Sequence, residues 1–222
     1  DGRADVGVLY DYGASTSTLW MFRSTGTGFA APEAWWRSGA GSWASSSSKL
    51  AVGDYTGDGR ADVGVLYDYG ASTSTLWMFR STGTGFAAPE AWWRSGAGSW
   101  ASSSSKLAVG DYTGDGRADV GVLYDYGAST STLWMFRSTG TGFAAPEAWW
   151  RSAAGSWASP RSKLAVGDYT GDGRADVGVL YDYGASTSTL WMFRSTGTGF
   201  TAPEAWWRSA AGSWASPRSK LT

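Results

Sequence analysis

Four short apolar segments, separated by Gly/Ser-rich stretches, recur along the chain. Residues 49–55 form an apolar run that ends in a turn signal, and residues 61–69 alternate between apolar and polar positions. Residues 75–80 are apolar on both faces, as expected of a strand buried between two layers. Residues 86–94 carry a proline near their start, where a missing N–H is tolerated in a strand. No segment has the 3.6-residue period of a helix, so the pattern predicts four strands joined by turns.

The two central predicted strands suggest how such sheets pack. Val65 and Tyr67 lie on one face of the alternating strand, and Gly64 lies on the other. We expect Gly64 to allow a close approach between neighbouring sheets. We expect Trp77 and Phe79, on the next strand, to fill the gap where the sheets diverge.

The four predicted strands belong to a unit of 57 residues that occurs four times. The first two copies are identical, and the third and fourth differ from them at a few positions, which indicates recent duplication or deliberate construction. The copies are residues 1–57, 58–114, 115–171 and 172–222. A four-stranded unit with a period of about 40–60 residues is typical of a β-propeller, because one sheet cannot bury both of its faces alone. The predicted fold class is therefore all-β, a β-propeller of four-stranded antiparallel blades.

The two ends of the sequence predict a way to close the ring. Residues 220–222 match residues 49–51, so we expect them to pair with the strand predicted at residues 4–12 and to share one terminal blade. Closure within one chain gives a four-bladed monomer, and closure between two chains gives an eight-bladed dimer. The large tryptophan wedges favour the wider ring, so we expect self-association, with the four-bladed monomer or an open array as alternatives.

The composition excludes several functions. The 222 residues carry a net charge of −1 and no basic patch, so no nucleic acid is expected as a partner. No apolar run approaches the ~18 residues of a membrane helix, so no membrane insertion is expected. The chain has no cysteine and no histidine, which removes thiol chemistry and the commonest general base. Glu33 is expected to pair with Arg23 or Arg37 rather than to act in catalysis, so the predicted protein is not an enzyme.

An aspartate-rich loop precedes each alternating strand. Asp54, Asp58 and Asp62 repel one another unless something compensates their charge. With the Thr56 hydroxyl and the Arg60 backbone carbonyl they form a set of hard oxygen donors, which suits Ca²⁺. The equivalent predicted ligands in the next two loops are Asp111, Thr113, Asp115, Arg117 and Asp119, and Asp168, Thr170, Asp172, Arg174 and Asp176. The alternative is an Asp/Gly-rich turn whose side chains cap backbone N–H groups.

The segment LAVGDYTGDGRADVGVLY, residues 50–67, resembles the FG-GAP/VCBS repeat of integrin-type propellers and of many secreted bacterial proteins. The segment TGTGFAAP, residues 25–32, is loosely similar to the Phe-Gly and Gly-Ala-Pro elements of that family. The resemblance covers essentially every copy. It implies propeller blades with calcium at the rim of a hairpin, and an extracellular protein. The family commonly has seven blades, and four copies depart from that number.

Sixteen tryptophans suggest either a ligand surface or a structural role. Trp35 and Trp36 are adjacent in a predicted strand, and Trp43 lies in a Gly/Ser loop. Exposed tryptophan beside Asp, Arg and Ser is typical of a sugar-stacking pocket, whereas wedges between blades are the alternative and the expectation for Trp20. The candidate ligand-binding residues are Trp36, Trp43, Trp93, Trp100, Trp150, Trp157, Trp207 and Trp214.

Together these patterns predict a non-catalytic, calcium-binding, lectin-like module that binds glycans at several sites. Sequences similar to this repeat occur in propeller lectins, which supports that prediction. The alternatives are a structural or protein-interaction scaffold, including an engineered or recently amplified chain without a selected ligand, and an accessory domain of an enzyme.

Overall fold

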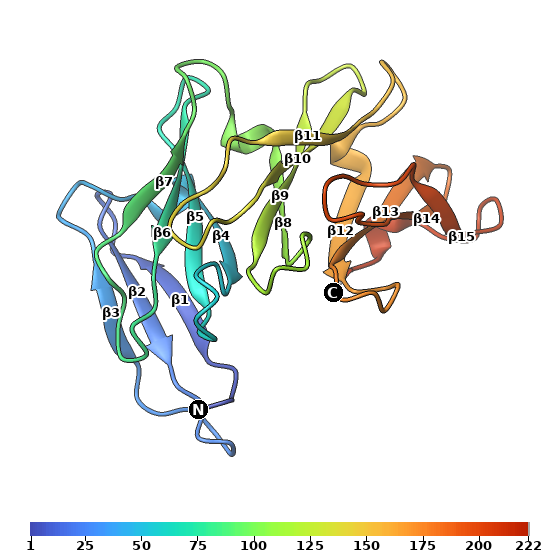
Figure 1. Cartoon of the computed structure of the whole chain (residues 1–222). Coiled ribbons are helices and arrows are strands. Elements are labelled where there is room, and N and C mark those ends of the chain that lie inside the picture. The colour runs from blue at the N-terminus through green and yellow to red at the C-terminus, as the bar shows by residue number, and fades with distance from the viewer. Residues whose placement is uncertain (222) are drawn as a thin grey trace. The chain divides into compact units, whose positions relative to one another are not determined.

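The structure, a computed structural model, describes residues 1–221 and is built almost entirely of short strands (Figure 1). The strands of the first two copies are β1 (Val6–Asp11), β2 (Ser17–Phe22), β3 (Glu33–Arg37), β4 (Ser48–Gly53), β5 (Asp62–Asp68), β6 (Ser74–Phe79) and β7 (Glu90–Arg94). Those of the last two copies are β8 (Ser105–Gly110), β9 (Asp119–Asp125), β10 (Ser131–Phe136), β11 (Glu147–Arg151), β12 (Ser162–Gly167), β13 (Asp176–Gly184), β14 (Thr187–Phe193) and β15 (Glu204–Arg208). Four single 3₁₀ turns are η1 (Ser45–Ser47), η2 (Ser102–Ser104), η3 (Ser159–Arg161) and η4 (Ser216–Arg218).

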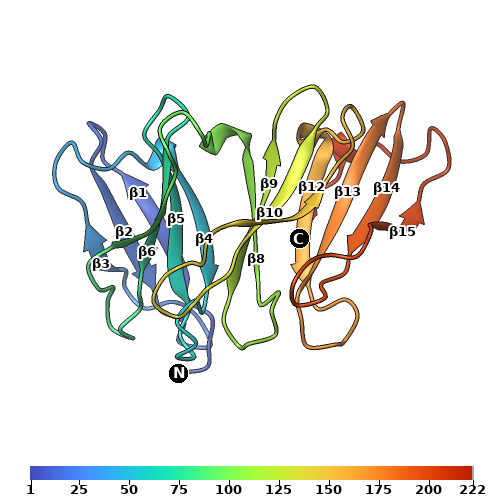
Figure 2. The same cartoon turned by 45° about the horizontal axis from the view of Figure 1, so that its top comes forward.

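The strands form four separate antiparallel sheets, which Figure 2 shows from a second side. Three sheets have four strands in chain order, β4 to β7, β8 to β11 and β12 to β15, and the sheet β1–β2–β3 has three. The chain divides into two compact units. Unit 1 comprises Asp1–Leu50 and Asp62–Ser102, and unit 2 comprises Ala51–Ala61 and the residues from Ser103 onward. The prediction of an all-β chain of antiparallel four-stranded blades is confirmed.

The observed strands follow the predicted segments except at the start of the last one. Residues 86–94 were expected to form one strand, but β7 begins only at Glu90, and Phe86 makes an isolated bridge to Ser81. Two features delay the strand. The backbone N–H of Thr82 bonds to the carbonyl of Gly85 in a tight turn at 2.9 Å, and Pro89 has no N–H to offer to a ladder.

Sheets within one unit pack through a tryptophan from the loop after the last strand. In unit 1, Trp43 contacts Tyr67, with ring centroids 4.6 Å apart, and Phe79 at 5.6 Å. In unit 2, Trp157 repeats both contacts with Tyr181 and Phe193, at 4.6 and 5.7 Å. The alternating segment β5 is buried along almost its whole length, whereas the equivalent β1 is mostly exposed.

Two sheets of unit 2 approach each other closely at a glycine that ends the first strand of the blade. A Cβ at Gly110 would lie 2.6 Å from the Cβ of Ala175 and 2.8 Å from a methyl of Val166. Gly121, the equivalent of Gly64, instead lies against Ala108 of its own sheet. The close approach expected at the Gly64 position therefore lies at the Gly110 position, because that is where the first strands of adjacent sheets meet.

Candidate functional site

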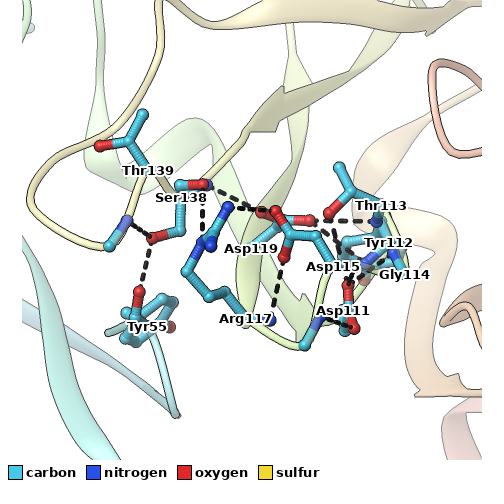
Figure 3. A network of polar contacts seen from close by, with 12 residues as sticks. Tyr55, Asp111, Tyr112, Thr113, Gly114, Asp115, Arg117, Asp119, Ser138 and Thr139 are labelled. Atoms are coloured by element: carbon cyan, nitrogen blue, oxygen red, sulfur yellow. Dashed lines mark hydrogen bonds and ion pairs between the residues drawn. The ribbon is translucent and has the colours of Figure 1, made fainter. Parts of the chain in front are cut away.

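The aspartate loop of residues 111–119 lies wholly in unit 2 and wraps its backbone around one carboxylate (Figure 3). Asp111 Oδ1 accepts hydrogen bonds from the N–H groups of Gly114 at 2.7 Å and Asp115 at 3.1 Å, and its Oδ2 accepts one from Gly116 at 2.8 Å. Gly114 and Gly116 have φ of +74° and +83°, a conformation that glycine adopts without strain. The glycines of the motif therefore aim three backbone donors at Asp111.

Asp119 is buried at the start of β9 and joins the loop to the next hairpin. Its Oδ1 accepts from the N–H of Ser138 at 2.8 Å, and its Oδ2 accepts from those of Tyr112 and Thr113 at 3.2 and 3.3 Å. Burial raises the pKa of Asp119 to about 6, and the nearby charges of Asp115 and Asp111 add to the rise, although the N–H groups of Ser138 and Thr113 oppose it. A buried carboxylate beside two others makes this the part of the loop where negative charge costs most.

The third carboxylate of the loop, Asp115, pairs with the guanidinium of Arg117. The other two loops repeat the arrangement. Asp168 accepts from the N–H groups of Gly171, Asp172 and Gly173, and these bonds, with Gly173 first, lower the pKa of Asp168. Across residues 1–221 no three acidic side chains converge as a metal cluster would. The carboxylates accept hydrogen bonds from backbone N–H groups, as expected for the alternative of an Asp/Gly-rich turn.

The loop tryptophans proposed to bind sugar lie in two different environments. Trp43, Trp100 and Trp157 are each only 6% exposed, whereas Trp214 is 46% exposed. Two hydrogen bonds fix the backbone of Trp157. Its backbone N–H donates to the carbonyl of Ser129 at 2.8 Å, and its carbonyl accepts from Ser131 Oγ at 3.0 Å. Trp43 and Trp157 are wedges between two sheets of their own unit, and in all three copies the ring has no open face for a sugar.

The strand tryptophans follow the same trend. Trp36, Trp93 and Trp150 are half-buried, and Trp207 is exposed. Trp36 lies edge-on to Trp43, with ring centroids 5.2 Å apart. Trp36, Trp93 and Trp150 therefore pack against the buried loop tryptophan of their own copy, whereas Trp207 is exposed.

Each blade also carries an exposed cluster that the sequence patterns did not reveal. Tyr69 is 53% exposed, and its hydroxyl accepts a hydrogen bond from the indole N–H of Trp77 at 3.1 Å. The guanidinium of Arg94 lies 5.1 Å from the centre of the Trp77 ring, within cation–π range. We call this group the Tyr–Trp–Arg cluster. Its four copies are Tyr12, Trp20 and Arg37; Tyr69, Trp77 and Arg94; Tyr126, Trp134 and Arg151; and Tyr183, Trp191 and Arg208.

The glutamate that could have served in catalysis is engaged in every blade. Glu33 accepts from Arg23 at 2.6 Å and from the indole N–H of Trp35 at 3.2 Å. The bond from Arg23, more than that from Trp35, holds the pKa of Glu33 below its usual value. The expected pairing of Glu33 is therefore with Arg23, and Arg37 is placed over Trp20 instead.

Comparison with known proteins agrees with this fold. The family model described as FG-GAP-like repeat matches residues 1–65, which confirms the resemblance for that stretch. No protein of curated function matches the chain. None of the helices among the described residues is long and apolar enough to cross a membrane.

Among the solved structures that are similar to this chain, one matches most of its length. It is an Agrocybe aegerita lectin that specifically recognises non-reducing terminal N-acetylglucosamine. The two structures share 20% sequence identity and superpose with a TM-score of 0.65, over 90% of this chain and 52% of the lectin. This similarity shows the fold, and the antiparallel sheets are blades of the β-propeller class. The chain spans about half the length of that lectin.

Proposed function

We propose that the chain is a non-catalytic, calcium-binding propeller module that binds carbohydrate at several equivalent sites. The observation that carries the proposal is the Tyr–Trp–Arg cluster, which is solvent-accessible and occurs once in every blade. The likeness to a lectin of the same fold class supports it. The proposed ligands are glycans of cell surfaces and matrices, so the proposal includes an extracellular location.

The cluster has the chemistry that a sugar needs. The ring of Tyr69 offers an exposed apolar face on which the C–H face of a pyranose can stack, while its hydroxyl stays hydrogen-bonded to Trp77. Arg94 lies over Trp77 and presents N–H donors to sugar hydroxyls from a fixed position. A few placed polar groups beside aromatic faces are typical of small-ligand sites. Single sites of this kind bind weakly, and repetition raises the overall affinity through avidity.

The carbohydrate proposal is tested on an array of glycans that includes chains ending in N-acetylglucosamine. We expect the chain to bind at least one glycan, and we expect binding to be lost when all four cluster tyrosines are changed to alanine. The matched control changes the same four tyrosines to phenylalanine, which keeps the stacking ring and is expected to keep most of the binding. The four residues are Tyr12, Tyr69, Tyr126 and Tyr183. Absence of any glycan signal, or equal binding by the alanine variant, would overturn the proposal and favour a scaffold.

Calcium binding is the second part of the proposal and rests on donor chemistry. Asp111, Asp115 and Asp119, with the Thr113 hydroxyl and the Arg117 carbonyl, supply hard oxygens in one short loop. Burial, and to a smaller extent the charges of Asp115 and Asp111, raise the pKa of Asp119, and a bound Ca²⁺ would offset that accumulated negative charge. Since Asp115 now pairs with Arg117, binding requires that carboxylate to release the guanidinium.

Thermal unfolding with calcium and with a chelator tests this part separately. A ligand that binds only the folded state adds about 2.7 kcal/mol at a hundredfold excess over its Kd, so calcium is expected to raise the melting temperature by several degrees. Magnesium at the same concentration is the control and is expected to do less. Identical melting curves in calcium and in chelator would leave the loop as a hydrogen-bonded turn.

A further inference from the structure

The sheet β1–β2–β3 has an exposed apolar face. The equivalent face of β4–β7, the other sheet of unit 1, is buried. Val8 is 37% exposed and Tyr10 is 53% exposed, whereas their equivalents Val65 and Tyr67 are 2% and 9% exposed. The open face forms an apolar groove of about 280 Å³. Its lining residues are Val8, Tyr10, Tyr12, Trp20, Phe22 and Pro32.

The last blade has the opposite face free. Trp206, Trp207 and Trp214 are all exposed, whereas Trp149 and Trp157, the equivalents of Trp206 and Trp214, are buried. The exposed tryptophan face of the last blade and the open groove of the first blade consist of equivalent residues to two faces that pack together inside each unit.

The internal contacts therefore show what fits the groove. Trp157 packs against Tyr181, Trp191 and Phe193, and the backbone N–H of the following residue donates to the Tyr181 hydroxyl at 3.0 Å. Trp43 makes the same three ring contacts in unit 1. One repeat of 57 residues further on, the same contacts would join Trp214 to the residues equivalent to Tyr181, Trp191 and Phe193, which are Tyr10, Trp20 and Phe22. These three residues line the groove.

We propose that the groove is a docking site for a second copy of this chain, which seats its Trp214 on Tyr10, Trp20 and Phe22. The contact is head-to-tail, since the last blade of one copy meets the first blade of the other. Such an interface leads to a closed ring when the rotation closes and to a longer assembly when it does not.

A second set of contacts supports the same occupant. The ammonium of Lys106 donates to the carbonyls of Ser159 and Ser162 at 2.6 and 2.5 Å, and Lys163 does the same with Ser216 and Ser219. Lys220 is the next lysine of this series, and the equivalent acceptors are the carbonyls of Ser45 and Ser48 in the second copy.

The edge of β1 fits the same arrangement. In the last blade, β12 pairs with β13 so that Ser162 lies opposite Tyr181 and Lys163 lies opposite Leu180. Within the described sheet, β1 pairs only with β2 and has an open edge on its other side. The same register places Ser219 of the second copy opposite Tyr10. An open strand edge beside an apolar groove is a template for pairing with another chain.

The similar lectin favours a second copy over the same copy as the occupant. This chain superposes on only about half of that lectin chain. Four blades of this kind therefore match part of a longer chain, and a second copy would supply more blades of matching sequence.

Light scattering after size exclusion, over a range of concentrations, tests the proposal. We expect the 23.5 kDa chain to form a species of at least twice that mass. Trp214→Ala is expected to weaken association about thirtyfold or more, as for a central interface tryptophan. Tyr183→Ala is the matched control, because Tyr183 is equally exposed in the same blade but belongs to the Tyr–Trp–Arg cluster. It is expected to associate like the original chain.

A mixing experiment separates a lost interface from a misfolded variant. Trp214→Ala removes the free tryptophan, and Tyr10→Ala damages the groove, so neither variant is expected to associate with itself. Mixed together, they retain one intact pair of faces and are expected to form a dimer. A monomeric mass of the original chain at all concentrations would overturn the proposal, including the case in which its own last blade fills the groove. Unchanged association of Trp214→Ala, or failure of the mixture to form dimers, would also overturn it.

Discussion

The hairpins β1–β2 and β13–β14, in the first and last blades, have equivalent sequences and very different surroundings. Val8 and Tyr10 on β1 are exposed, and Val179 and Tyr181 on β13 are buried. Their local structure is the same, since the indole of Trp20 donates to Tyr12 at 3.2 Å and that of Trp191 donates to Tyr183 at 3.1 Å. Burial is therefore set by the neighbouring sheet and not by the strand itself, so one repeat in isolation would leave its apolar faces in water.

The strongest test of this comparison is to replace the loop tryptophan at a buried position, Trp157, and at an exposed one, Trp214. Trp157→Ala leaves a cavity between two sheets of unit 2 and is expected to lower the free energy of unfolding by about 3–5 kcal/mol. Trp214→Ala removes an exposed ring and is expected to cost about 1 kcal/mol or less. Urea unfolding at dilute protein measures both. Equal losses would show that Trp214 is covered as Trp157 is.

A smaller effect is expected at the glycine where sheets of unit 2 approach each other. Gly110→Ala places a methyl group 2.6 Å from Ala175, so the sheets must separate, at a cost of about 1–3 kcal/mol. Gly167→Ala is the same change at the same strand position of the last blade, where the nearest atom is Tyr169 Cζ at 3.4 Å. Dilute samples of Gly167→Ala should unfold close to the original chain. A large loss there would contradict the difference between inner and outer blades.

The smallest effect is expected where inner and outer blades are alike. The Arg–Glu pairs lower the pKa of Glu147 and of Glu204 below 4.5, and the bond from arginine is the main cause in both. A carboxylate with a lowered folded pKa stabilises the protein above about pH 4.5, and that contribution is lost as the pH falls through the folded pKa. Glu147→Gln and Glu204→Gln should each slightly flatten the fall in melting temperature between pH 6 and pH 3. Unequal slopes would mean that these exposed pairs also sense the neighbouring sheet.

The sequence was sufficient to predict the strands because their signals are local. Alternation in residues 61–69 and apolar faces in residues 75–80 correspond to β5 and β6. The environment of Trp43 depends on a sheet that follows it, and a Gly/Ser loop suggested an exposed ring. In the structure the ring packs on Tyr67 of that sheet. Such contacts between repeats are not visible in a single repeat.

The position of the acidic loop was predictable from the sequence, its role as a calcium site stays a prediction, and the aromatic cluster was missed. Asp111 and Asp119 were identified from spacing alone, although their hydrogen bonds to backbone N–H groups depend on the fold. The Tyr–Trp–Arg cluster required strand register. Arg94 lies opposite Thr75, and the register then shifts between Leu76 and Trp77, which leaves Arg94 near the indole. Cross-strand alignment of the predicted segments could have suggested this pair, but not the shift.

Equivalent hydrogen bonds between repeats join residues that are the same number of positions apart in the sequence. This has a consequence for how the gene can change in length. Lys49 and Lys106 both reach a carbonyl 53 residues ahead, and Ser138 and Ser195 both reach a carbonyl 83 residues back. An unequal crossover that adds or removes whole 57-residue units preserves every such offset in the daughter gene. Chain length can therefore change in one genetic step without a new interface having to evolve, whereas a deletion of any other length would break these pairings at the junction.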